Sequence, residues 1–346
     1  MKKIKIAQIG VGHDHACEIV KSIKRQKDLF ELVGYCAPDN EANDFKNNLQ
    51  FFKDVREMTI EEILEYPGLD AVVIETEEKN LTQYATMACG RIPAVHMDKP
   101  GGMILEDFEN LIKLAKENKT ILHLGYMYRY NPLVIDTFNK IKKGEIGEVY
   151  SVEAQMNGRH NPQKRQWLEQ FPGGMMFFLG CHLVDLILQI QGEPDEIIPF
   201  NTSTGFDGVN AKDYGMAIFK YKNGISFAKS CAEEIGGFQR RQLVVTGEKG
   251  TIEIKPLEEH AYEINPELVE ISWTYSEMSE VYQKDCIPEK GWSDFRHKIR
   301  SEIYNRYDGM LSCFAEYVCG DKQNPYTYDY ELLLYKCVLK ACGVKF

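Results

Sequence analysis

The sequence predicts an α/β fold in two parts: a doubly wound parallel sheet, followed by an α+β part with a mostly antiparallel sheet. Up to residue 124, short apolar runs alternate with amphipathic helical segments, which is typical of a parallel sheet covered by helices on both faces. Beyond residue 125, consecutive strand-like runs are joined by hairpin signals. The length of 346 residues suits two domains, which we place at residues 1–124 and 125–346.

The elements of the first part follow one another in a regular order. Short apolar or alternating runs bounded by turn residues predict strands at residues 3–9, 29–36, 71–74, 93–97 and 121–124. Helical spacing of apolar residues predicts helices at 16–27, 81–89 and 106–117. In the first of these helices, Ile19, Val20 and Ile23 share one side, which we expect to be buried.

The second part begins with a helix and is then dominated by strands. The helix is predicted at 133–143 and the strands at 148–156, 214–221, 225–231, 242–246 and 251–254. Asn223-Gly224 is a strong hairpin signal, and Glu248-Lys249-Gly250 is a weaker one. A helix at about 180–191 interrupts the strands, and two helices at about 306–319 and 329–342 close the chain.

Composition and charge exclude several classes of protein. The chain is 44% hydrophobic and 27% charged, as in a globular protein, and its net charge of −11 would repel a nucleic-acid backbone. No apolar run approaches the roughly 18–20 residues that span a bilayer, and the N-terminus lacks the apolar stretch of a signal peptide, so we expect a cytoplasmic protein with no membrane partner. The ten cysteines include no C-x-x-C pair, which excludes zinc ribbons and fingers.

A glycine turn lies between the first predicted strand and the first helix. Gly10-Val11-Gly12 is followed by His13, Asp14 and His15, so the third glycine of a dinucleotide fingerprint is missing. Such a turn lets a pyrophosphate approach the backbone and rest on free N–H groups at the helix start. His13 and His15 alone do not make a metal site, because no third ligand follows in the loop, and we expect no metal.

The fingerprint also expects an acidic residue at the end of the second strand, where it would bind ribose hydroxyls. Ala37 occupies that position, and Asp39 comes two residues later. No basic residue follows Ala37 to pair with a 2′-phosphate, so the sequence favours NAD over NADP only weakly.

Two further clusters could carry chemistry. Asp98-Lys99-Pro100 lies at the carboxyl end of the predicted strand 93–97, the edge of a parallel sheet at which active sites collect. His182 opens the predicted helix at 180–191, with Asp185 one turn further along. Taken singly, each is compatible with an ordinary surface lysine or a buried histidine; their joint occurrence favours a site.

The ordered set of motifs resembles the Gfo/Idh/MocA family of oxidoreductases from residue 4 to about residue 254. The set comprises the glycine turn, Asp98-Lys99-Pro100, Gly125 to Pro132, Gly144-Glu145-Ile146-Gly147 and Gly180-Cys181-His182. The resemblance implies a Rossmann domain followed by an α/β domain with a large open sheet. It also implies a nicotinamide cofactor, a sugar or cyclitol substrate, and dimers or tetramers built through that sheet.

The resemblance assigns roles to individual residues. Lys99 matches the family's catalytic lysine, and His182 matches its catalytic histidine. The residues expected at the cofactor are Gly10, Val11, Gly12, His13, His15, Ala37, Asp39, Thr76, Asp98, Lys99 and Pro100. Those expected at the substrate are Lys99, Tyr128, Arg129, His160, Arg165, Trp167, His182 and Asp185. Phe178 is a departure, because many members carry an aspartate at this position, four residues before the histidine.

The sequence therefore favours an NAD(P)-dependent dehydrogenase or reductase acting on a carbohydrate-like alcohol. Two alternatives stay open. In one, the cofactor is recycled in each turnover and the net reaction is elimination or glycoside hydrolysis. In the other, Phe178 marks a non-catalytic protein that senses a nucleotide or sugar, although the retained Lys99 and His182 argue against this.

Overall fold

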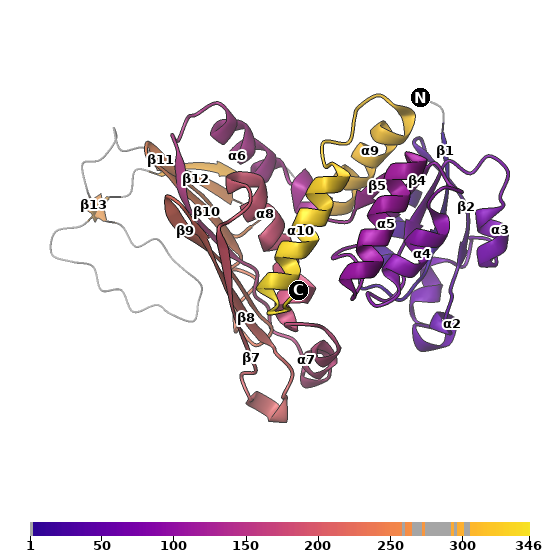
Figure 1. Cartoon of the computed structure of the whole chain (residues 1–346), viewed down its shortest axis with the longest axis horizontal. Coiled ribbons are helices and arrows are strands. Elements are labelled where there is room, and N and C mark those ends of the chain that lie inside the picture. Colours follow the sequence, from indigo (N-terminus) through magenta and orange to yellow (C-terminus); the bar gives the residue numbers. More distant parts are fainter. Residues whose placement is uncertain (1–2, 258–259, 265–271, 274–291, 294–295, 301–304) are drawn as a thin grey trace.

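The first part of the chain forms a five-stranded parallel sheet with the order β2-β1-β3-β4-β5 (Figure 1). The computed structural model describes residues 3–257, 260–264, 272–273, 292–293, 296–300 and 305–346. The strands are β1 (Ile4–Ile9), β2 (Phe30–Cys36), β3 (Ala71–Ile74), β4 (Ala94–Met97) and β5 (Ile121–Leu124). Each predicted strand is confirmed, and the central strands β3 and β4 are buried along their whole length, as parallel strands covered on both faces must be.

Helices cover this sheet and connect its strands. The predicted helices are confirmed as α1 (Ala16–Arg25), α4 (Leu81–Ala88) and α5 (Leu105–Asn118), and Ile19, Val20 and Ile23 of α1 are buried as expected. Two short helices between β2 and β3 escaped prediction, α2 (Glu41–Asp44) and α3 (Ile60–Leu64). Helices of four or five residues are too short to show a helical period.

The second part contains an eight-stranded sheet with the order β15-β12-β11-β10-β6-β9-β8-β7. Its strands are β6 (Val149–Gln155), β7 (Glu196–Thr202), β8 (Tyr214–Tyr221), β9 (Gly224–Cys231), β10 (Gln242–Gly247), β11 (Gly250–Ile254), β12 (His260–Ile264) and β15 (Arg296–Arg300). A separate pair joins β13 (Ser272–Trp273) to β14 (Trp292–Ser293). All pairings in the large sheet are antiparallel except β6 with β9. Both predicted hairpins are present, with Tyr221 opposite Gly224 and Gly247 opposite Gly250.

The two faces of the large sheet differ. Ala217, Phe219 and Ala228 are buried on the face covered by helices, among them α8 (Cys181–Gln191). On the opposite face, Ile198, Ile218 and Phe227 lie side by side on β7, β8 and β9 and are only half-buried. This alternation along each strand is expected when one face of a sheet packs on a core and the other is left open.

The last two helices lie between the two sheets (Figure 1). Helix α9 (Arg306–Cys319) packs against α1 and β5 of the first sheet. Helix α10 (Tyr328–Ala341) packs against α5 on one side and against α8 and β7 on the other. The end of the chain therefore joins both sheets. Helix α6 (Pro132–Lys142) follows β5 and starts the second part, close to the predicted position.

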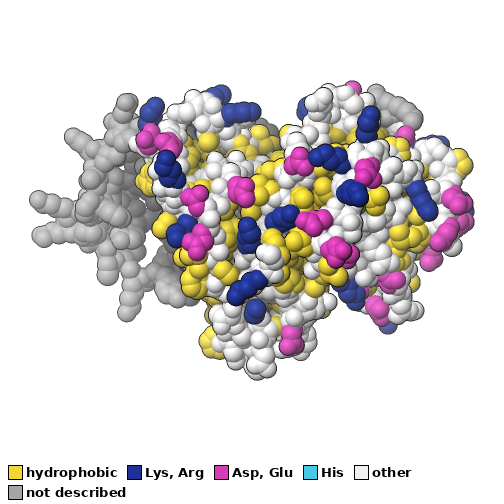
Figure 2. Space-filling model, viewed as in Figure 1, with side chains coloured by type: hydrophobic (Ala, Val, Ile, Leu, Met, Phe, Trp, Pro, Cys, Tyr) yellow, Lys and Arg dark blue, Asp and Glu magenta, His cyan; other side chains and the backbone are white. Residues whose placement is uncertain are grey.

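Charges of both signs are interspersed on the face of the molecule shown in Figure 2. In the part of the chain that the structure describes, no helix has the length and apolar character needed to cross a bilayer.

Candidate cofactor and active site

The glycine turn is closely packed against the neighbouring strand end. Gly10 has a φ of +99°, and a Cβ there would overlap the backbone of Thr76, which follows β3. At Gly12, a Cβ would lie 2.6 Å from the Oε1 atom of Glu41. Glycine is therefore required at position 10 by close approach to backbone and by the left-handed conformation, whereas a side chain at position 12 would displace the Glu41 carboxylate.

The backbone N–H groups of this turn bind a carboxylate. Glu41, the first residue of α2, accepts hydrogen bonds through Oε2 from Val11 N at 2.6 Å and from Gly12 N at 3.0 Å. Its Oε1 atom accepts from Glu77 N at 2.9 Å. The Glu41 side chain is buried, and burial raises its pKa to about 7. Sequence reasoning missed Glu41, because it lies in a helix too short to recognise.

Ala37 and Asp39 are placed differently from a ribose-binding acid at a strand end. Ala37 packs on a small apolar cluster that includes Val11. The Oδ2 atom of Asp39 accepts hydrogen bonds from the Tyr84 hydroxyl at 2.7 Å and from Asn80 Nδ2 at 3.0 Å. Asp39 is therefore engaged with the start of α4 rather than with the glycine turn.

Two histidines of the turn meet Asp98 from the end of β4. The Nδ1 atom of His15 is 2.9 Å from Asp98 Oδ2, and the Nδ1 atom of His13 is 3.3 Å from the same oxygen. Burial lowers the pKa of His13 to about 3, so its imidazole is neutral at ordinary pH. Burial opposes ionisation of Asp98, but its contacts with the histidines, including the His15 hydrogen bond, and the positive charge of Lys99 outweigh this and hold its pKa well below the usual range.

Further buried polar groups surround His13. Glu78 Oε1 lies 3.8 Å from His13 Nε2, and Glu75 Oε2 lies 3.8 Å from His13 Nδ1. These carboxylate oxygens and His13 Nε2 have no hydrogen-bond partner among the described residues. Ligand atoms of His13, His15 and Asp98 also lie within 4.8 Å of one another, which is close enough for a metal ion. The absence of a metal therefore stays a prediction.

Lys99 follows Asp98 and is fully buried. The Lys99–Pro100 peptide bond is cis. The Nζ atom of Lys99 donates to the carbonyl oxygen of Phe178 at 3.0 Å and lies 4.8 Å from the centre of the Phe178 ring. Burial disfavours its charge, but surrounding acidic groups, among them Asp98, outweigh burial and raise the pKa of Lys99. Lys99 is therefore an ammonium ion at neutral pH.

His182 lies one turn beyond Phe178, where a π-helical turn (Met176–Gly180) passes into α8. Its ring stands edge-on to those of Tyr126 and Tyr128, with centroids 5.7 and 5.2 Å away. Burial, followed by the charge of Lys99, lowers the pKa of His182 well below its usual value. Neither ring nitrogen has a hydrogen-bond partner among the residues described. His182 is thus a neutral, buried imidazole beside a cation.

Arg129 and Asp185, expected at the substrate, lie in a buried ion triad with Glu331. Arg129 Nε is 3.0 Å from Asp185 Oδ2, and Arg129 Nη1 is 2.5 Å from Glu331 Oε1. All three side chains are buried, and the Tyr330 hydroxyl donates to Asp185 at 2.8 Å. This triad joins the segment after β5 to α8 and α10, and a contact of Arg129 or Asp185 with substrate stays a prediction.

Arg165, also expected at the substrate, pairs with several carboxylates. Its buried guanidinium pairs with Asp213 at 3.1 Å, with Glu233 at 3.2 Å and with Asp207. Its charge is thus matched by three carboxylates, and its contact with a substrate stays a prediction.

Trp167 and His160 remain candidate substrate residues. The Trp167 ring packs edge-on against Phe178, with centroids 5.3 Å apart, and therefore lies near Lys99. Lys164 lies 3.5 Å from the centre of the Trp167 ring and pairs with Asp14 at 2.7 Å, which ties α7 (Pro162–Trp167) to the glycine turn. His160 is partly buried, and its Nε2 atom has no partner within the described part of the chain.

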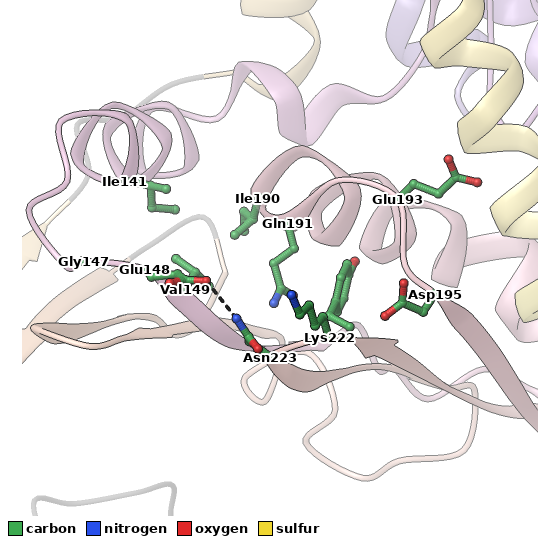
Figure 3. A pocket seen from close by; sticks show the side chains of 11 residues that line it. Ile141, Gly147, Glu148, Val149, Ile190, Gln191, Glu193, Asp195, Lys222 and Asn223 are labelled. Atoms are coloured by element: carbon green, nitrogen blue, oxygen red, sulfur yellow. Dashed lines mark hydrogen bonds between the residues drawn. The ribbon is translucent and has the colours of Figure 1, made fainter.

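A surface hollow of about 420 Å³ lies away from these groups (Figure 3). It is lined by Ile141, Gln191 and Glu193, and by Asn223, which donates to Glu148 at 3.4 Å. None of the predicted site residues lines it.

The turn after β1 has the features that a dinucleotide requires. Its N–H groups donate to an acceptor oxygen, that of Glu41, Gly10 admits no side chain, and buried polar atoms beyond it have no hydrogen-bond partner among the described residues. These residues fit a nicotinamide dinucleotide, whose phosphates the turn would hold. The fold and site thus define a dinucleotide-binding α/β protein.

Comparison with known proteins defines the family. Residues 4–126 match the family described as "Oxidoreductase family, NAD-binding Rossmann fold", and residues 139–253 match the "GFO/IDH/MocA C-terminal domain". The chain belongs to the Gfo/Idh/MocA family of oxidoreductases, which confirms the resemblance read from the sequence.

Individual relatives are distant. An uncharacterised oxidoreductase of Escherichia coli, YhhX, is 24% identical over 202 residues, which are 56% of this chain and 55% of that protein. A scyllo-inositol 2-dehydrogenase (NAD(+)) of Bacillus subtilis is 32% identical over 87 residues, 25% of each chain. The chain thus spans about half, or less, of the length of the curated relatives it matches. A solved oxidoreductase from Thermotoga maritima shares the fold with a TM-score of 0.75 at 17% identity, covering 99% of this chain and 96% of that one.

Proposed function

We propose that the protein is an NAD(P)-dependent dehydrogenase or reductase that acts on a sugar or cyclitol-like alcohol or ketone. The observation that carries this proposal is the pairing of a buried neutral His182, with both nitrogens unpartnered among the described residues, and a buried cationic Lys99. A substrate hydroxyl placed between them would meet one proton acceptor and one positive charge.

His182 and Lys99 would have different roles in the reaction. In the oxidation direction, His182 takes the proton from the hydroxyl, which its neutral ring can accept. Lys99 holds the same oxygen and stabilises the negative charge that develops on it. Hydride acceptance from the carbon is the chemistry that a bound nicotinamide would supply. Trp167 and His160 would border the substrate, and Tyr128 would flank His182.

The named relatives support a polyhydroxylated substrate. Two scyllo-inositol 2-dehydrogenases of Bacillus subtilis match this chain, one described with NAD(+) and one, 26% identical over 142 residues, with NADP(+). A structural neighbour from Acidithiobacillus ferrooxidans, with a TM-score of 0.76, is a UDP-N-acetylglucosamine 3-dehydrogenase. These names favour a ring alcohol as substrate and are compatible with either NAD or NADP as cofactor.

The test is a scan of sugars and cyclitols with NAD and with NADP, read as absorbance of the reduced cofactor. We expect net reduction with at least one ring alcohol, and loss of that activity in His182→Ala. If purified protein binds neither cofactor in a calorimetric titration, the proposal is wrong.

A redox-neutral reaction is the second candidate. It is favoured by one relative, the 2,7-anhydro-N-acetylneuraminate hydratase of Escherichia coli, which is 24% identical over 198 residues. The same scan separates the two, because this reaction would convert substrate, followed by chromatography, without net change in the reduced cofactor.

We further propose that the chain forms homodimers or homotetramers through the open face of the large sheet. Its half-buried row of Ile198, Ile218 and Phe227 is the support, because apolar surface of this kind favours burial. Light scattering should show a dimer or tetramer that Phe227→Lys dissociates.

We also propose residues 1–124 and 125–346 as the two domains, since β5 ends at Leu124.

A further inference from the structure

Two ammonium groups lie against one aromatic ring beside the candidate active site. Lys99 Nζ is 4.8 Å from the centre of the Phe178 ring, and Lys164 Nζ is 4.7 Å from it. Lys164 pairs with Asp14, whereas Lys99 donates to the neutral carbonyl oxygen of Phe178 and forms no ion pair with a described residue. The substrate side of the site is therefore positively charged.

A third cation, Arg241, lies at the end of the loop between β9 and β10. Its Nε atom donates to the carbonyl oxygen of Asn157 at 3.0 Å, and its guanidinium lies 4.4 Å from the centre of the Phe238 ring. The side chain is half-buried and pairs with no carboxylate in the part of the chain that the structure describes. Arg241 is close enough to act on His182, because burial chiefly lowers the pKa of His182 and the charges of Lys99 and Arg241 both add to this.

Arg241 and His160 meet beside Gly158. A Cβ at Gly158 would lie 3.6 Å from His160 Nε2 and 3.8 Å from Arg241 Nη2, so both nitrogens lie next to the same point. His160 Nε2 has no hydrogen-bond partner among the residues described, and burial followed by the charge of Lys164 lowers the pKa of His160. A neutral imidazole and a guanidinium with free N–H groups can together bind an anionic oxygen.

The acids of the adjoining loop are already paired with other cations. Glu233 lies 3.2 Å from Arg165 Nε, and Glu234 lies 2.8 Å from Arg240 Nη1. Neither carboxylate is within ion-pair distance of Arg241. The charge of Arg241 is thus left for a ligand to balance.

We propose that the substrate is a sugar acid, a ring alcohol that also bears a carboxylate, and that Arg241 and His160 bind this carboxylate. The inference rests on the proposed function, because it takes His182 and Lys99 as the groups that face the reacting hydroxyl. The carboxylate itself is unchanged in the reaction. Arg241 is then a residue that sets substrate specificity.

A carboxylate suits this position better than a neutral hydroxyl or a phosphate. A guanidinium and a carboxylate can form two parallel hydrogen bonds, and their single charges balance. A neutral sugar would remove water from the guanidinium of Arg241 without supplying a negative charge. A phosphate ester would bring roughly two negative charges, and the further cation that acts on His160, Lys164, is already held by Asp14.

The test compares pairs of sugars that differ at one carbon, D-glucuronate with D-glucose and D-galacturonate with D-galactose. For the wild type we expect kcat/KM to be about tenfold or more higher for the acid in at least one pair, the usual contribution of a hydrogen bond to a charged group. D-glucose 6-phosphate tests the other anion. Equal or higher kcat/KM for the neutral sugar in both pairs, or for the phosphate over both acids, overturns the inference.

Variants test the role of Arg241. Arg241→Gln removes the charge and keeps a donor for the carbonyl oxygen of Asn157. It should raise KM for the acid about 10- to 100-fold, with kcat and the KM for the neutral sugar within about twofold of the wild type. Arg240→Gln is the matched control, and it should leave both KM values within about twofold. If Arg241→Gln raises the two KM values equally, Arg241 has only a structural role and the inference is overturned.

Binding measured without turnover separates this inference from the proposed function. Calorimetry titrates each sugar into the complex of the intact protein with reduced cofactor. If neither acid binds more weakly to Arg241→Gln than to the wild type, the inference is overturned. A wild type that oxidises neutral ring alcohols but binds neither acid contradicts only this inference. A wild type that binds an acid through Arg241, yet reduces no cofactor with any sugar, contradicts the proposed function.

Discussion

The ammonium group of Lys99 donates a hydrogen bond to the backbone carbonyl oxygen of Phe178, with the two atoms 3.0 Å apart. The ring of Phe178 also lies under that ammonium. The residue that stands where many relatives carry an aspartate therefore still contacts the lysine, but as a neutral group. No carboxylate stands at position 178 beside Lys99, and the positive charge of Lys99 helps to lower the pKa of His182.

Introducing a carboxylate at position 178 should shift the pH dependence of oxidation. His182 must be neutral to accept a proton, so activity falls as pH drops through its pKa, which burial and Lys99 now hold low. Phe178→Asp adds a negative charge that favours the imidazolium and should move the acidic limb of the kcat profile to higher pH. Phe178→Leu serves as the uncharged control. An acidic limb that stays in place in Phe178→Asp would contradict the argument.

Removing either member of the Lys99–His182 pair should abolish most turnover without abolishing cofactor binding. His182→Ala should lower kcat by about 10²–10⁴, the usual contribution of a positioned acid–base group. Lys99→Met should cost at least as much, because the developing negative charge then has no cation beside it. Steady-state kinetics and NADH titration check both. Near-normal turnover in His182→Ala would rule out the mechanism.

A methyl group at Gly12 should weaken cofactor binding more than it weakens the fold. The new Cβ would lie 2.6 Å from Glu41 Oε1, so Gly12→Ala must displace that carboxylate from the turn. We expect NADH affinity to fall at least about tenfold, which corresponds to about 1.4 kcal/mol. Gly309→Ala is the matched control, because its Cβ would approach no closer than 3.7 Å to another atom in α9's surroundings. Equal NADH affinities in the two variants would show that the cofactor does not bind at this turn.

The Arg129 triad should contribute far more to stability than an exposed ion pair. Arg129→Met leaves the carboxylates of Asp185 and Glu331 buried without their cation, which should cost about 3–5 kcal/mol in the free energy of unfolding. Arg25→Met breaks a partly exposed pair with Asp308 and should cost less than about 1 kcal/mol. Urea unfolding followed by circular dichroism compares the two. Similar losses would show that the triad is not the structural junction described here.

Buried Glu78 should make stability fall as pH rises. Burial raises its pKa from 4.5 to about 7, so the folded protein holds a proton there that the unfolded chain releases. The contribution of this proton to the stability of the folded protein is complete below pH 4.5 and is lost as the pH rises through about 7. The glutamine in Glu78→Gln cannot ionise. Between pH 5 and pH 8, the free energy of unfolding of this variant should therefore rise relative to that of the wild type by as much as about 3 kcal/mol. A pH-independent difference between the two proteins would contradict this.

Much of the fold could be predicted because its strands are short, buried and apolar. The runs at 71–74, 121–124 and 214–221, and the closing helix at 306–319, coincide with β3, β5, β8 and α9. β7 escaped prediction, because it is an edge strand of mixed polarity that contains Pro199 and is buried nowhere along its length. Predicted ends of other elements differ by one or two residues, where caps rather than apolar runs decide.

The candidate site was predictable only where a motif marks it. The glycine turn, Lys99 and His182 were identified as candidates by the order of motifs, which reflects the backbone that holds them. Arg129 and Arg165 were expected at a substrate, yet their carboxylate partners come from segments up to 202 residues away in the sequence. Local sequence contains no sign of such pairings. The same holds for Glu41, which reaches the turn by way of two left-handed residues.

The position of the last two helices has a consequence for how the chain is made. The five-stranded sheet is complete at Leu124, whereas α9 and α10, which cover α1 and α5, begin only at Arg306 and Tyr328. During synthesis from the N-terminus, the first sheet can form long before these helices leave the ribosome. Until then, apolar surface destined for α9 and α10 is exposed to solvent. A nascent chain stalled after residue 124 should therefore recruit chaperones, and the full chain should release them.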